Sequence, residues 1–303
     1  MTLMHHTYLA GKNYQAVRKI FFLLLFLAIS FETSAQVTVQ FTLPSYSDAE
    51  NVGDNVPQLL IEGTVFLIAT VEITDLLSGT ATNGTDYNYA SNPQIVNIPA
   101  GFYPPGSAFD LPNFFVNSDT TLEDNETVNF LLSNATGEAS LIGQTATTYT
   151  ILNDDSATLT ITNQTVAEDV AGGQMIFTVT LDNAVDGGTD VDYSFTDGSA
   201  TNGDDYTGTS DTLSFDGTIN ETETIIVPIN NDAIVEGDET FTVSLGIPTN
   251  SGVSVIGSPA TGTITNDDSA TLTISNQTVA EDVAGGQMVF TVTLNNEVEG
   301  GTD

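Results

Sequence analysis

Basic side chains are almost absent from the sequence. Its 303 residues contain 3 Lys and Arg residues against 40 Asp and Glu residues, and the formal net charge is −37. The three basic residues, Lys12, Arg18 and Lys19, and both histidines lie within the first 19 positions. Because binding to phosphate groups needs Lys or Arg, nucleic acid is excluded as a partner of the remaining chain. Binding to an anionic membrane surface is disfavoured for the same reason.

The lack of histidine and lysine beyond residue 19 also limits the available chemistry. Nucleophilic catalysis by a hydroxyl group needs such a base. A pair of carboxylates of the glycosidase kind is the alternative, but sugar sites usually contain aromatic platforms and the chain has no Trp. We therefore expect no enzymatic activity. Cysteine is absent too, which excludes a disulfide framework.

The one long apolar run lies at the N-terminus. Basic residues precede the run at residues 20–31, and the small residues Thr33 and Ala35 follow it. This order is typical of a secretory signal peptide, here residues 1–35. The run is shorter than the roughly 20 residues that span a bilayer, although a signal anchor is the alternative. We expect an exported protein, secreted or at the cell surface, with no transmembrane segment in the sequence after the run.

The sequence repeats itself with a period of 113 residues. Residues 156–190 and 269–303 differ at only five positions, and a diverged earlier copy is visible because residues 117–132 resemble residues 230–245. This period is too long for a solenoid and fits an array of domains. The predicted parts are the signal peptide (1–35), a diverged repeat 1 (36–155), repeat 2 (156–268) and a truncated start of repeat 3 (269–303). Because so short a start cannot bury a core, we expect the chain to be a fragment of a longer protein.

Repeat 2 contains seven runs that are typical of strands. Most alternate between apolar and polar residues, as at Phe177, Val179 and Leu181, and Gly, Asn, Asp and Pro separate them. Seven strands in a repeat of this length predict an antiparallel β-sandwich of Ig-like type. The predicted fold class is therefore all-β, with tandem seven-stranded antiparallel sandwiches after the signal peptide. The runs span residues 157–166, 175–181, 191–195, 211–215, 223–229, 240–245 and 260–265.

Acidic residues gather at one pole of the predicted sandwich. Consecutive strands alternate in direction, so the first, third and fifth loops meet the end of the last strand there. Like charges a few Å apart repel by about 1 kcal/mol per pair even in water. Ca²⁺ binds about 6–8 oxygen ligands from flexible loops, Mg²⁺ fits such loops less well, and Zn²⁺ prefers His or Cys. We therefore expect bound calcium, with solvated turns as the alternative for any single loop. The acidic residues of this pole are Glu168, Asp169, Asp204, Asp205, Asp232, Glu236, Asp238, Glu239, Asp267 and Asp268.

These motifs together resemble the Calx-beta domain family. The family pattern has a Glu after the first strand, a G-[ST]-D-Y segment, an acidic DD…E..E.F.V.L segment and a terminal acidic run. Here Glu168, residues 203–206, residues 230–245 and residues 266–268 correspond to them. The resemblance covers repeats 1 and 2 and the start of repeat 3. It implies a β-sandwich that binds several calcium ions at one pole, as in the domains of sodium/calcium exchangers.

The resemblance also implies a set of calcium ligands in each repeat. Asn231 and Asn266 stand where the strongest binders of the family carry Asp, and Ser118 and Asn153 stand there in repeat 1, which implies fewer or more weakly bound ions. Repeat 3 offers only Glu281. In repeat 2 the implied ligands are Glu168, Asp205, Asp232, Glu236, Glu239, Asp267 and Asp268, with the carbonyl group of Ile234. In repeat 1 they are Glu50, Asp86, Asp119, Glu123, Glu126, Asp154 and Asp155.

The predicted function is a calcium-binding extracellular array that acts as a calcium-stiffened stalk or as an adhesion and cell-communication module. Its expected partners are calcium ions, neighbouring repeats of the same chain and a cell-surface or matrix ligand. The near identity of repeats 2 and 3 favours the stalk, because duplication adjusts length. The alternatives are a calcium-sensing regulatory module of a membrane protein and purely structural repeats without metal.

Overall fold

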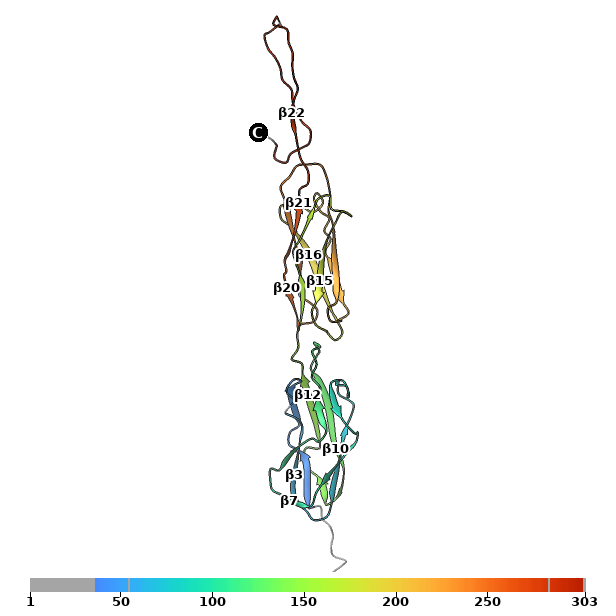
Figure 1. Ribbon diagram of the computed structural model, residues 1–303. Helices are drawn as coiled ribbons and strands as arrows, with labels where there is room; N and C mark the ends of the chain where they lie inside the picture. The colour runs from blue at the N-terminus through green and yellow to red at the C-terminus, as the bar shows by residue number, and fades with distance from the viewer. Residues whose placement is uncertain (1–35, 54, 283, 302–303) are drawn as a thin grey trace, which may run out of the picture. The chain divides into compact units, whose positions relative to one another are not determined.

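The structure of the protein is a computed structural model that describes residues 36–53, 55–282 and 284–301 (Figure 1). The predicted signal peptide, residues 1–35, lies outside the described residues. The described part consists of strands joined by turns and loops. Within it, no helix is long and apolar enough to cross a membrane.

The chain divides into two compact units. Unit 1 comprises Met1–Ser118 and Asn125–Leu152, and unit 2 comprises Asp119–Asp124 and Asn153–Asp303. The short segment Asp119–Asp124 belongs to repeat 1 in sequence, but it groups with unit 2 in the structure. Each unit has a hydrophobic core of its own.

Unit 1 is built from two five-stranded sheets and a small two-stranded one. One large sheet has the order β11-β1-β3-β7, with β8 also paired to β3, and the other has the order β2-β12-β10-β4-β6. Strands β5 and β9 form the small sheet. Aromatic rings of Phe114, Phe130 and Tyr149 pack edge to face in the core. The strands are β1 (Val37–Phe41), β2 (Ser45–Ala49), β3 (Gln58–Val65), β4 (Ala69–Asp75), β5 (Tyr87–Tyr89), β6 (Gln94–Ile98), β7 (Gly101–Tyr103), β8 (Ala108–Asp110), β9 (Phe114–Val116), β10 (Glu126–Gly137), β11 (Ala139–Leu141) and β12 (Ala146–Leu152).

The sandwich of unit 2 repeats this plan with a four-stranded and a five-stranded sheet. Their orders are β18-β15-β13-β20 and β14-β21-β19-β16-β17. The core lies between them, where Phe177 of β15 meets Phe241 of β19 edge to face at a ring distance of 6.1 Å. The strands are β13 (Ala157–Ile161), β14 (Gln164–Ala167), β15 (Gln174–Leu181), β16 (Thr189–Asp197), β17 (Asp211–Phe215), β18 (Thr222–Pro228), β19 (Glu239–Leu245), β20 (Val253–Ile256) and β21 (Ala260–Thr265).

The alternation in the sequence decides which face of each strand is buried. In β15, Met175, Phe177 and Val179 are fully buried, whereas Ile176 and Thr178 between them are exposed. Successive side chains of a strand point to opposite faces, so one set lines the core and the other meets solvent. The predicted all-β sandwich in tandem copies is confirmed.

The strand pattern differs from the prediction in two places. The first run divides into β13 and β14, which belong to different sheets, because the exposed Thr162 and Asn163 carry the chain across. The Asn163 side chain accepts a hydrogen bond from the backbone N–H of Thr261 (2.8 Å) and holds this crossing. Residues 253–256, expected as loop, form β20, which pairs with β13 in parallel. The sandwich is thus not purely antiparallel, since β14 and β21 are also parallel.

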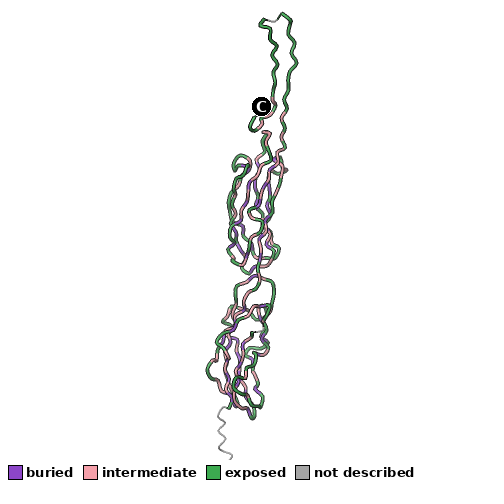
Figure 2. The backbone as a smooth tube through the Cα atoms, turned by 90° about the vertical axis from the view of Figure 1, so that its left-hand side faces the viewer, coloured by how far each residue is buried: buried purple, intermediate pink, exposed green. Residues whose placement is uncertain are grey.

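The start of repeat 3 forms an open hairpin. Strands β22 (Leu272–Ile274) and β23 (Val292–Leu294) pair in antiparallel fashion, and Figure 2 shows most of the hairpin in the colour of exposed residues. Leu272 is 59% exposed, whereas its counterpart Leu159 in repeat 2 is fully buried at 0%. The same local sequence therefore has a core around it in repeat 2 and none in the described part of repeat 3.

Candidate metal centres

The acidic residues of unit 2 come together because of the strand order. Strands β14 and β21 run in parallel, so Glu168 and Asp268, which follow them, leave the sheet at the same end. The backbone N–H of Glu168 still donates to the carbonyl group of Thr265 at 3.0 Å. The loop between β18 and β19 carries Asp232 and Glu236 to this end, and the loop between β16 and β17 carries Asp205.

Glu168, Asp232 and Asp268 form the first acidic cluster. One carboxylate oxygen from each lies within 4.8 Å of the other two. Glu168 is only 6% exposed, and its Oε1 accepts a hydrogen bond from the backbone N–H of Asp232 at 2.8 Å. The Oδ2 atom of Asp268 is buried and has no hydrogen-bond partner. Because a buried oxygen without a partner is costly, this position favours a ligand that accepts its lone pairs.

Asp205, Glu236 and Glu239 form the second acidic cluster, with the same spacing of at most 4.8 Å between their oxygens. The Oδ2 of Asp205 accepts hydrogen bonds from the backbone N–H and the hydroxyl group of Thr201, at 2.7 and 3.1 Å. This turn fixes the carboxylate beside Glu239, the first residue of β19.

Crowding and burial raise the pKa values of several carboxyl groups. Burial, followed by the neighbouring Asp205, raises the pKa of Glu239 to about 7. Burial is also the main cause that raises the pKa of Glu168, against the opposing hydrogen bond from Asp232. The pKa of Glu236 is raised by burial and then by Asp232 and Asp205. The pole thus holds its negative charge at a cost when no cation is bound.

These pKa values predict a dependence of stability on pH. Glu239 titrates near 7 in the folded protein, above its ordinary value of 4.5, so the folded chain binds a proton that the unfolded chain has lost in this window. Without divalent cations, unit 2 is expected to become less stable as the pH rises from about 5 to 8. Thermal melts in chelator across this range test the slope. The variant Glu239→Gln is expected to flatten it, and an unchanged slope in that variant would contradict the assignment to Glu239.

The structure brings together six of the seven predicted ligands of repeat 2. Asp267 is exposed and belongs to neither cluster. Asp238 is also exposed, and its Oδ1 accepts a hydrogen bond from the backbone N–H of Asn266 at 3.3 Å. The backbone N–H of Ile234 donates to the Oδ1 of Asp232 at 2.7 Å, which orders the turn.

The side chain of Asn266 has a structural role that could not be predicted from the sequence. Its Oδ1 accepts from the backbone N–H of Glu236 (3.1 Å), and its Nδ2 donates to the carbonyl group of Asp268 (3.0 Å). Asn153, at the same position of repeat 1, makes the same two bonds to Glu123 and Asp155. The recurrence of Asn at a spacing of 113 was the available signal.

The predicted ligands of repeat 1 divide between the two units. In unit 2, the Oδ1 of Asp119 accepts from the backbone N–H of Thr121 at 2.7 Å. Burial, followed by Asp154 and Asp119, raises the pKa of Asp155. In repeat 3, Glu281 is exposed. Unit 2 contains Asp119, Glu123, Asp154 and Asp155, and unit 1 contains Glu50, Asp86 and Glu126.

The chemistry of the two clusters in unit 2 fits a hard divalent cation. Every side-chain donor in them is a carboxylate oxygen, and the sequence provides no Lys, Arg or His after residue 19 to neutralise them. Oxygen donors from several loops suit Ca²⁺, whereas Zn²⁺ prefers nitrogen and sulfur ligands. The orphaned Oδ2 of Asp268 supports the same assignment.

Comparison with known proteins gives one family and several similar structures. The sequence model of the Calx-beta domain matches residues 32–156 and 152–278. The apo form of the Calx CBD1 domain is 25% identical, with 38% of this chain and 100% of that chain covered and a TM-score of 0.33. CBD12 from CALX1.2 is 21% identical over 76% of this chain and 99% of that chain, with a TM-score of 0.32. A tetra-tandem repeat in the extending region of a large adhesion protein is 15% identical over 86% of this chain and 63% of that chain, with a TM-score of 0.30. No curated protein matches the chain.

Proposed function

Because the chain belongs to the Calx-beta domain family, as its motifs predicted, we propose that it is an array of β-sandwich repeats that bind calcium at their acidic poles. The observation that carries this proposal is the pair of acidic clusters in unit 2, together with the buried and unpartnered Oδ2 of Asp268. The proposed role is binding and mechanical support, with no catalytic step.

The residues that would hold calcium in repeat 2 are those of the two clusters. Glu168 positions the loop that carries Asp232 through its hydrogen bond, and Asn266 positions both Glu236 and Asp268. Bound calcium would supply positive charge where the protein has only carboxylates. Because the two repeats correspond in sequence, we propose the equivalent ligands in repeat 1, namely Glu50, Asp86, Asp119, Glu123, Glu126, Asp154 and Asp155. We also propose Asp267, at the end of repeat 2, as a ligand.

The proposed physiological role is a calcium-stiffened stalk or adhesion module outside the cell. Asp267 and Asp268 end repeat 2 and directly precede Ser269, where repeat 3 starts. An ion that joins Asp268 to the loop of Asp232 restrains the chain at the point where it leaves the sandwich. The position of the clusters at the end of the sandwich supports the stalk role. The proposed location outside the cell rests on the predicted signal peptide.

Calcium is expected to raise the thermal midpoint of unit 2 in the full chain. A ligand that binds only the folded state stabilises it by about 2.7 kcal/mol at a concentration of 100 times its dissociation constant. Melts in millimolar calcium and in chelator measure the shift. The double variant Asp232→Asn with Glu236→Gln is expected to lose most of it, since it removes one charge from each cluster.

A matched control is the double variant Asp190→Asn with Glu223→Gln, which makes the same charge change outside both clusters. It is expected to keep the full calcium shift. Equal midpoints in calcium and in chelator would reject the metal proposal and leave purely structural repeats. Small-angle scattering of the full chain tests the stalk, because stiffening is expected to narrow the distribution of chain dimensions when calcium is added.

A further inference from the structure

One apolar residue stands out in the acid-rich segment Asp119–Asp124, which we call the docking loop. Leu122 is only 3% exposed and belongs to the hydrophobic core of unit 2, although its sequence lies in repeat 1. A leucine at this depth contributes to the stability of the core that surrounds it. Its burial needs an explanation, because the loop around it is otherwise polar.

The backbone of Leu122 pairs with the loop between β15 and β16. Its N–H donates to the carbonyl group of Ala184, and its carbonyl group accepts from the N–H of Asp186, both at 2.9 Å. The two bonds form a parallel bridge between Leu122 and Val185, which is also buried. The Nδ2 of Asn183 donates to the carbonyl group of Thr120 and extends this contact.

The same backbone pairing occurs a second time, 113 residues further along the chain. The N–H of Val235 donates to the carbonyl group of Glu297, and the carbonyl group of Val235 accepts from the N–H of Glu299, both at 3.0 Å. Val235 and Val298 form the corresponding parallel bridge. Every partner in this second contact is the repeat equivalent of one in the first. Because the same hydrogen-bond pattern occurs twice at the repeat spacing, the pairing is a recurring feature of the repeat.

We propose that this loop is a docking element that needs no metal. Each repeat inserts one apolar residue into the base of the repeat that follows, so the core of a repeat is completed by its predecessor. The partner of this surface is therefore another repeat of the same kind, and the recognition signal is an apolar residue directly before a Glu, as in Leu122-Glu123 and Val235-Glu236. The proposal is independent of calcium binding, since the bridge uses backbone groups and an aliphatic side chain.

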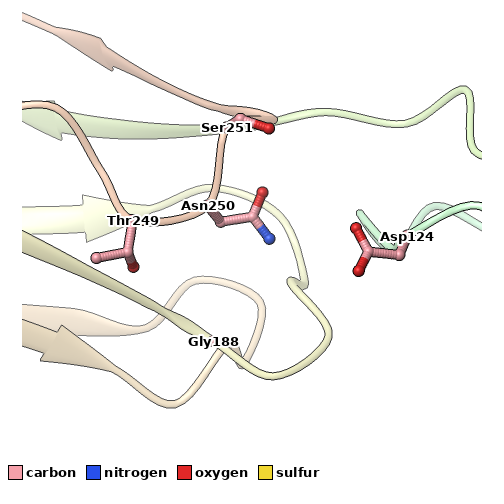
Figure 3. A pocket seen from close by; sticks show the side chains of 5 residues that line it. All are labelled: Asp124, Gly188, Thr249, Asn250 and Ser251. Atoms are coloured by element: carbon pink, nitrogen blue, oxygen red, sulfur yellow. The ribbon is translucent and has the colours of Figure 1, made fainter.

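The last residue of the docking loop, Asp124, lines a pocket of about 330 Å³ together with Gly188, Thr249, Asn250 and Ser251. Figure 3 shows Asp124 and Asn250 facing each other across this space. The lining is polar, whereas Leu122 belongs to the hydrophobic core, so Leu122 supplies the apolar part of the contact.

Gly252 provides a sharp test, because it lies against Leu122. A Cβ atom added to Gly252 would be 2.5 Å from Cδ1 and 2.9 Å from Cδ2 of Leu122, and its three nearest neighbours are all atoms of that side chain. The backbone of Gly252 does not have a positive φ, so alanine is otherwise acceptable there. Gly237 is the matched control, because its Cβ would meet nothing within 4 Å and its φ is not positive either.

The experiment is a double-mutant cycle on the full chain, read out by the thermal midpoint of unit 2 in chelator. Leu122→Ala alone is expected to lower the midpoint by roughly 5 °C or more, because it empties a buried site. Gly252→Ala is expected to lower the midpoint in the native background and to raise it in the Leu122→Ala background, where the new methyl group fills space. Gly237→Ala is expected to change the midpoint equally in both backgrounds.

Hydrogen exchange of single amides supplies a second readout. In Leu122→Ala, protection of the Asp186 amide is expected to fall by roughly tenfold, whereas the amide of Asp182, which donates to Thr158 within the sandwich, is expected to keep its protection. If Gly252→Ala behaves like Gly237→Ala in both backgrounds, and the Asp186 amide exchanges as before, the docking proposal is overturned.

Discussion

Replacing Phe177 with alanine is expected to lower the free energy of unfolding of unit 2 by about 3–5 kcal/mol. Phe177 is fully buried at 0% exposure and joins the two sheets, because its ring meets Phe241 edge to face. The change removes a large apolar side chain and leaves a cavity that rigid strands on both sides cannot close. Urea unfolding followed by circular dichroism measures the loss.

The chain contains its own control for this change. Phe290 is the repeat 3 equivalent of Phe177, with the same neighbours Met, Thr and Val in sequence, but it is 53% exposed. Phe290→Ala is therefore expected to change stability by less than about 1 kcal/mol. If both variants lost the same free energy of unfolding, the burial of Phe177 would not explain its contribution to stability.

Glu168→Gln is expected to change stability in opposite directions with and without calcium. The amide keeps an oxygen for the N–H of Asp232 but removes a buried negative charge from the first acidic cluster. In chelator the midpoint of unit 2 is expected to rise, because repulsion from Asp232 and Asp268 disappears. In calcium the ion-induced shift is expected to shrink, with binding weaker by roughly tenfold, since affinity follows the charge of the ligands.

The control is again the equivalent residue of repeat 3. Glu281 is exposed, and the described part of repeat 3 contains no acidic cluster around it. Glu281→Gln is expected to leave both midpoints unchanged. A Glu168→Gln variant that loses stability in chelator would contradict the expected rise, because it would show that the carboxylate stabilises the metal-free fold.

Much of the fold could be predicted from local patterns. The alternation at Phe177 and Val179 identified β15 and its buried face, because one side of that strand lies on a core. Strand β20 could not be identified in this way. Residues 253–256 are short and flanked by Gly, and their strand form depends on parallel pairing with β13, about 100 residues away. The same holds for the division of residues 157–166 between two sheets.

The candidate site, too, could be predicted only in part from the sequence. The motifs implied seven acidic ligands in repeat 2, and the structure finds six of them in two clusters. They did not separate Asp267 from Asp268, because only the path of the chain after β21 decides which of two adjacent carboxylates faces the cluster. Leu122 was missed for a different reason. Its signal, a single apolar residue inside an acidic loop, has no meaning until its partner at Val185 is known.

The parallel pairing of β14 with β21 has a consequence for a repeat under tension. The chain enters the sandwich of unit 2 through β13 and β14 and leaves it just after β21. Strands β14 and β21 run side by side, with Gln164 opposite Gly262 and Ala167 opposite Thr265. A pull on the two chain ends slides these strands along each other, so the hydrogen bonds between them bear the load together and cannot open one by one. Strands β2 and β12 give unit 1 the same shear geometry.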